Sequence, residues 1–128
     1  MARIADVMRD EYITVAPEDT LGEVAARMTG LGVGAVVVKD FGRLVGILTE
    51  RDMLKAMAAR VHTSEARVRQ WMTLDPVTAS PDLPVEEASQ IMLDNGFRHL
   101  VVVDGSTVLG VVSLRRVVAA MTPSGDAA

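Results

Sequence analysis

The amino-acid sequence repeats itself without a gap at a shift of 64 residues, which places Met8 on Met72. The same shift superposes identical glycines, prolines, threonines, acids and methionines. They are Thr14 and Thr78, Pro17 and Pro81, Glu23 and Glu87, Met28 and Met92, Gly32 and Gly96, Asp40 and Asp104, and Gly46 and Gly110. Chance matching of apolar residues would not carry the glycines, prolines and threonines along. The chain therefore forms one supersecondary unit twice.

Each half predicts the same order of elements: strand, helix, strand, strand, helix. In "TLGEVAARM", Thr20 stands three residues before Glu23 and apolar residues follow at helical spacing, which predicts a capped amphipathic helix. The apolar runs "GAVVVKD" and "RLVGILT", separated by "FG", predict two strands around a tight turn, and "HLVVVD" and "TVLGVVS" predict the same pair in the second half. Their near-continuous apolar character indicates burial on both faces. "ERDMLKAMAAR" predicts the helix that closes the first half.

These elements predict an α+β fold of two βαββα repeats. We expect the repeats at residues 1–60 and 65–122, joined by the polar segment "RVHTSEAR" and followed by a flexible tail at 123–128. A hydrophobic content of 49% lets the chain bury a substantial core. Each half alone is small, so we expect the two sheets to pack together about a pseudo-twofold axis.

Composition and charge exclude several classes of function. A net charge of −4 gives no general attraction for nucleic acid or for an anionic membrane. The absence of cysteine excludes disulfides and thiolate chemistry, and the two histidines lack the spacing of a metal site. The longest apolar runs are too short to span a bilayer, and no nucleophile stands beside a base in a known motif. We expect a cytoplasmic protein that is not an enzyme and that binds neither metal, nucleic acid nor membrane.

The repeated segments resemble a known family, the paired CBS (cystathionine β-synthase) domains that are also called a Bateman module. The resemblance rests on "ITVAPEDTLGEVAARM", "GVGAVVVKDFGRLVGILTERDML", "VTASPDLPVEEASQIM" and "GFRHLVVVDGSTVLGVVSLRRVV", and it covers nearly the whole chain. It implies a regulatory, non-catalytic module with two clefts that bind adenosine-type ligands such as AMP, ADP, ATP or S-adenosylmethionine, none of them an obligatory cofactor. It also implies a homodimer in which the modules pair helix to helix.

The segment "TERD" at residues 49–52 has two interpretations. As a helix cap, Thr49 is the N-cap and Asp52 reaches back to the backbone, a contribution of about 1 kcal/mol. As a ligand site, the carboxylate of Asp52 accepts bonds from the two vicinal hydroxyls of a ribose, beside a helix N-terminus that favours phosphate. The resemblance favours the ligand site, with Thr49 and Asp52 at its centre.

The resemblance carries further residues onto the same ligand. It implies Thr73 and Thr78 at the adenosine end, with Phe97, Arg98 and His99 at the cleft wall and the phosphates. Taken alone, Arg98 is typical of a solvated strand end, and His99 of a histidine bonded to a nearby carbonyl. Placed opposite the acid of "TERD", the guanidinium fork and a protonated imidazole suit phosphate oxygens.

The second half departs from the family pattern. "SLRR" keeps a hydroxyl at Ser113 but has Arg116 where the first half has Asp52. Arginine cannot accept a bond from a ribose, and its charge opposes the positive end of the following helix. We therefore expect a degenerate second cleft that lacks ordinary adenosine recognition. Its residues are Thr14, Val33, Gly34, Ser113 and Arg116.

Two questions stay open at this stage. The second cleft is empty, or holds an anion on Arg116, or uses Arg116 in an ion pair with Asp6 or Glu11. The whole chain is either a sensor of an adenosine-type ligand or a ligand-independent scaffold for dimerisation or for docking an unknown protein partner. "TERD" favours the sensor, and "SLRR" favours the scaffold.

Overall fold

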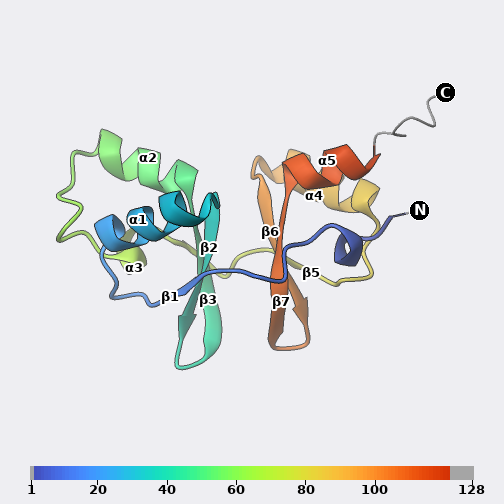
Figure 1. Ribbon diagram of the computed structural model, residues 1–128, viewed down its shortest axis with the longest axis horizontal. Helices are drawn as coiled ribbons and strands as arrows, with labels where there is room; N and C mark the ends of the chain where they lie inside the picture. The colour runs from blue at the N-terminus through green and yellow to red at the C-terminus, as the bar shows by residue number, and fades with distance from the viewer. Residues whose placement is uncertain (1, 122–128) are drawn as a thin grey trace. The chain divides into compact units, whose positions relative to one another are not determined.

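The computed structural model describes residues 2–121, which form two compact units (Figure 1). The continuous unit consists of Tyr12–Pro76, and the split unit combines residues 2–11 with residues 77–121. The expected flexible tail at 123–128 lies outside the described residues. Among those residues, no helix is long and apolar enough to cross a membrane.

The continuous unit has helices on one side of a mixed sheet with the strand order β1-β2-β3-β4. Strands β2 and β3 are antiparallel and turn at Phe41 and Gly42, whose φ angles of 51° and 76° fit a two-residue hairpin. β1 joins β2 in parallel, and β4 joins β3 antiparallel. The elements are β1 (Thr14–Val15), α1 (Leu21–Leu31), β2 (Ala35–Asp40), β3 (Arg43–Thr49), α2 (Glu50–Ala58), α3 (Val68–Trp71) and β4 (Thr73–Leu74).

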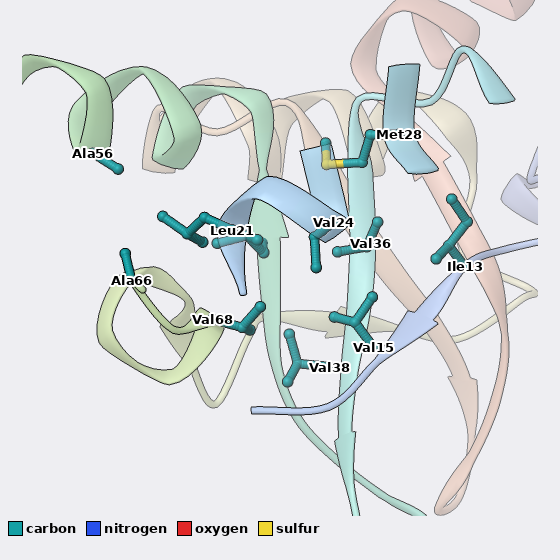
Figure 2. Close-up of a cluster of buried hydrophobic side chains, with 11 residues drawn as sticks. Ile13, Val15, Leu21, Val24, Met28, Val36, Val38, Ala56, Ala66 and Val68 are labelled. Carbon is teal, nitrogen blue, oxygen red and sulfur yellow. The ribbon is translucent and has the colours of Figure 1, made fainter. Parts of the chain in front are cut away.

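The core of the continuous unit lies between its sheet and its helices (Figure 2). Side chains from α1 and α3 converge there on alternate residues of β2, Val36 and Val38. Val37, which lies between them on the other face, is also fully buried, so the predicted burial of both faces is confirmed. The predicted cap of α1 is confirmed as well, because Thr20 Oγ1 accepts from the Glu23 N–H at 3.3 Å and donates to Glu23 Oε1 at 2.7 Å.

The split unit repeats this plan with a sheet of order β5-β6-β7. Leu100, Val102 and Val112 of that sheet pack against Val85 and Met92 of α4 and their neighbours. The fold is therefore mixed α/β, with the order strand, helix, strand, strand, helix formed twice as predicted. The elements are the 3-10 helix η1 (Ile4–Asp6), β5 (Thr78–Ala79), α4 (Val85–Asn95), β6 (His99–Asp104), β7 (Thr107–Ser113) and α5 (Leu114–Met121).

The first segments of the two sequence halves are exchanged between the units. Ile4 is fully buried in the core of the split unit, and its N–H donates to Leu83 O at 2.9 Å. Val68, which the shift of 64 relates to Ile4, is fully buried in the continuous unit and donates to Asp19 O at 2.9 Å. The repeat boundaries at 1–60 and 65–122 describe the sequence and stay a prediction, whereas the packed units cross them.

Apolar burial rather than charge holds the exchanged segments. Each segment also forms one ion pair with the unit it joins, Arg3 with Asp82 at 3.2 Å and Arg69 with Glu18 at 2.7 Å. All four of these side chains are more than half exposed, and exposed pairs contribute little to stability. Ile4 and Val68 are therefore the anchors.

We expect Ile4→Ala to loosen the split unit, although Ile4 belongs to the first repeat in sequence. The cavity left by a fully buried isoleucine costs about 2–5 kcal/mol of unfolding free energy. Hydrogen exchange read by mass spectrometry should show lost protection in β6 and β7, and the reciprocal variant Val68→Ala should show it in β2 and β3. Loss in β2 and β3 with Ile4→Ala would contradict the exchange.

Candidate functional site

One face of the sheet in the continuous unit carries three threonines. Side chains alternate along a strand, and Val36, Val38 and Leu48 face the helices. The residues between them therefore lie on the opposite face. The strand register pairs Thr14 with Val37, Ala35 with Thr49, Val37 with Ile47 and Ile47 with Thr73. We call this surface, with Thr14, Thr49 and Thr73, the threonine face.

Asp52 is held at one end of the threonine face by Thr49, where β3 ends and α2 begins. The Thr49 N–H and hydroxyl both donate to Asp52 Oδ2, at 2.9 and 3.1 Å, and Thr49 Oγ1 accepts from the Asp52 N–H at 3.3 Å. The helix-capping interpretation of "TERD" is thus confirmed. The cap also fixes the position of the carboxylate.

The cap uses one oxygen of Asp52 and leaves the other. Asp52 is 9% exposed. Among the described residues, every fully buried side-chain oxygen or nitrogen has a hydrogen-bond partner, and Asp52 Oδ1 receives no hydrogen bond there. Oδ1 is therefore not fully buried and can accept a bond from outside. A cap and a ligand site are compatible at this carboxylate.

Thr73 reaches the threonine face because residue 46 is glycine. A Cβ at Gly46 would stand 2.7 Å from Thr73 O and 2.9 Å from Met72 Sδ, so the backbone of β4 lies directly on that position. Gly110, the equivalent glycine of the other repeat, is likewise covered by the backbone of Arg9 and by the Met8 side chain. Sequence reasoning missed these contacts, although the two glycines that matched in the repeat were a signal for them.

The split unit has an equivalent face with a different chemistry. Thr78 pairs with Val101, His99 with Ser113, and Arg9 with Val111, so these residues lie on the face away from Leu100, Val102 and Val112. We call it the Arg9 face. Phe97 packs against the apolar core of this unit, and Arg98 is exposed.

The predicted ligand residues are thus divided between the units. Thr49, Asp52 and Thr73 lie together in the continuous unit, which brings the acid and the hydroxyls to one face. Thr78, Phe97, Arg98 and His99 lie in the split unit, and their joint role with Asp52 stays a prediction. Within residues 2–121, no three histidine or acidic residues are grouped as they would be around a metal ion.

The degenerate second cleft is divided in the same way. Thr14, Val33 and Gly34 lie in the continuous unit, where Gly34 O accepts from the N–H of Glu50 at 3.0 Å.

In the split unit, Ser113 Oγ accepts from the Arg116 N–H at 3.2 Å, which preserves half of the cap. The other half, which in the first repeat is the bond from the Thr49 N–H to the Asp52 carboxylate, has no equivalent here because an arginine side chain cannot accept a hydrogen bond. Within residues 2–121, Arg116 forms an ion pair with neither Asp6 nor Glu11, and the Asp6 carboxylate instead accepts from the Arg3 N–H at 2.9 Å.

Comparison with known proteins decides the family. The family model of the CBS domain matches residues 4–59 and 68–123. The chain belongs to the CBS domain family. The expected resemblance and the fold class are confirmed, and each family match corresponds to one copy of the sequence repeat.

Individual relatives agree with this assignment. The CBS domain-containing protein YhcV of Bacillus subtilis is 33% identical over 114 residues, which cover 89% of this chain and 81% of that protein. The structure of the CBS-domain containing protein ATU1752 from Agrobacterium tumefaciens superposes with a TM-score of 0.87 at 30% identity, over 94% of this chain and 99% of that one. The CBS domain pair of MJ0100, solved in complex with 5-methylthioadenosine and S-adenosyl-L-methionine, has a TM-score of 0.83 at 25% identity, over 94% and 95%.

We expect Gly46→Ala to destabilise the CBS pair, because the new methyl group collides with the backbone of Thr73. Overpacking of this kind costs about 1–3 kcal/mol. Gly30→Ala is the matched control, since a Cβ at Gly30 in α1 meets nothing within 4 Å and should stabilise the helix by about 0.5–1 kcal/mol. Chemical denaturation measures both variants, and equal stability of the two would show that β4 does not press on Gly46.

Proposed function

We propose that this CBS pair is a regulatory, non-catalytic module that binds an adenosine-type ligand, namely AMP, ADP, ATP or S-adenosylmethionine. The observation that carries the proposal is the state of Asp52, whose Oδ2 is fixed by Thr49 while Oδ1 stays able to accept. The complex of the MJ0100 CBS pair with two adenosine derivatives supports this ligand class. The expected cytoplasmic location stays a prediction.

In this proposal Asp52 recognises the ribose. A carboxylate held in one orientation can accept bonds from two vicinal hydroxyls, and each bond to a charged acceptor contributes about 1.5–3 kcal/mol. Thr73, on the same face, contributes at the adenosine end. Thr78, Phe97, Arg98 and His99 of the split unit complete the site, with Arg98 and His99 at the phosphates.

Ligand binding would transmit a regulatory signal by restraining the exchanged segment that contains α3 and β4. Asp52 belongs to the β3–α2 junction, whereas Thr73 belongs to the segment that α3 anchors through Val68. A ligand that contacts both residues adds a restraint to two parts of the chain that already meet through the short β3–β4 pairing and through the core around Val68. Such rigidification is itself a signal, because it changes what a second binding event must order.

The alternative is a ligand-independent scaffold for dimerisation or docking. It is favoured by exposed apolar side chains on the last helix of each repeat, Leu54 and Met57 on α2 and Met121 on α5. It is also favoured by Arg116, which removes ribose recognition from the second repeat. The two functions differ in whether an adenosine-type ligand stabilises the folded chain.

We expect Asp52→Ala to weaken binding of the adenosine-type ligand by about tenfold to a hundredfold and to leave the chain folded. Glu23→Ala is the matched control, because it removes the same kind of capping carboxylate from α1, away from the threonine face. A thermal-shift panel of AMP, ADP, ATP and S-adenosylmethionine identifies the ligand. Calorimetry then measures affinity and stoichiometry, for which we expect one ligand per chain.

Equal affinity of the parent and Asp52→Ala would reduce Asp52 to a helix cap. Stabilisation of the parent by none of the four compounds would favour the scaffold. Two equivalent sites per chain would show that Arg116 does not disable the second repeat.

We further propose that the protein is a homodimer through the exposed apolar side chains of α2 and α5. Met57→Glu places a charge in a position that is 71% exposed, so it should leave the fold intact and shift the dimer to monomer. Leu31→Glu on α1, at a position 62% exposed, is the control and should stay dimeric. Sedimentation distinguishes the species, and a monomeric parent would refute the proposal.

A further inference from the structure

Three arginines have their backbones bonded at or near the junction of β7 and α5 in the split unit. Arg9 pairs with Val111 through two backbone hydrogen bonds of 2.9 and 3.1 Å. Arg98 O accepts from the Leu114 N–H at 2.8 Å, and the Arg116 N–H donates to Ser113 Oγ at 3.2 Å. The backbones of all three arginines are thus fixed beside the end of β7 or the start of α5.

The strand register and the helix cap place two of these arginine residues near the Ser113 hydroxyl. Arg9 lies beside Val111 on the Arg9 face, and Ser113 is two residues further along β7 on the same face. Such diagonal neighbours are about 7–8 Å apart, a span that long side chains cover. The backbone N–H of Arg116 donates to the same hydroxyl, so the first turn of α5 holds the Arg116 residue next to Ser113.

The positive charge at this junction is not balanced by any described ion pair. Within residues 2–121, Arg9, Arg98 and Arg116 pair with no acid, and the ion pairs found there are those of Arg3 and Arg69. Asp10 and Glu11 follow Arg9 in sequence but pair with none of the three. The first turn of α5 contains no acidic residue, and its positive end adds to the repulsion.

The other repeat shows that this charge is not a property of the fold. The shift of 64 replaces Arg9 by Thr73, Arg98 by Gly34 and Arg116 by Asp52. The same backbone arrangement is therefore built in the continuous unit without a cation at any of the three positions.

We propose that the β7–α5 junction of the split unit is a site for an oxyanion of the phosphate class, distinct from the ribose site at Asp52. Guanidinium groups donate paired bonds to phosphate oxygens, and the Ser113 hydroxyl, which accepts from Arg116, still has a proton to donate. Arg116 stands where the other repeat has the acid that accepts from ribose hydroxyls, so the site takes the anion without a nucleoside. The proposal goes beyond nucleotide binding and does not depend on Asp52.

The test uses inorganic pyrophosphate as the probe and the full chain in its parent and variant forms. Arg9→Ala and Arg116→Ala should each weaken pyrophosphate binding in calorimetry by about tenfold or more. Arg98 is left unchanged, because it also belongs to the proposed nucleotide site. The control is Arg43→Ala, which removes the same charge from an exposed position at the start of β3 and should leave affinity unchanged within about twofold.

Two further measurements separate this site from the others. Thermal unfolding without the probe should show that Arg116→Ala is at least as stable as the parent, because a repulsive charge has been removed. Asp52→Ala should retain pyrophosphate binding even where it loses nucleotide. The proposal is overturned by a parent that does not bind pyrophosphate, by equal weakening in Arg43→Ala, or by loss of binding in Asp52→Ala.

Discussion

The arrangement of both units depends on the close approach of a backbone segment to a glycine. The backbone of Thr73 packs against Gly46, and the backbone of Arg9 packs against Gly110, at distances that a side chain on either glycine would not permit. Because these segments belong to the beginnings of the two repeats, the glycines permit the exchange that the burial of Ile4 and Val68 holds in place. Ile4 and Val68 are then delivered into the two cores.

The exchange also decides which side chains stand beside each strand–helix junction. It brings a threonine to the junction that has Asp52, and an arginine to the junction that has Arg116. The backbone hydrogen bonds of the junctions correspond pair by pair, since Glu50 donates to Gly34 O and Leu114 donates to Arg98 O. One backbone frame therefore presents an acceptor in one unit and a set of donors in the other.

Local features of this molecule could be predicted from the sequence, and long-range features could not. The caps at Thr20 and Thr49 join residues three apart, and the hairpin turns join adjacent strands, so short patterns determine them. The exchange joins Ile4 to Leu83, and a repeat gives no indication of which copy a segment completes. Ile4 and Val68 are both apolar, so their identities alone do not tell which of the two cores each one enters. For the same reason the sequence indicated Asp52 and Arg116 but not Arg9.

Two short stretches of chain join the units, and each has a residue of a candidate site at its end. Arg9 is held on β7 before the chain enters the continuous unit at Tyr12, and Thr73 is held on β3 before the chain leaves it after Pro76. A ligand bound beside Thr73 or an anion bound beside Arg9 would immobilise one of these connecting stretches. Once one stretch is immobilised, less conformational entropy is lost when the second site is occupied. Binding at the two sites should therefore be positively coupled.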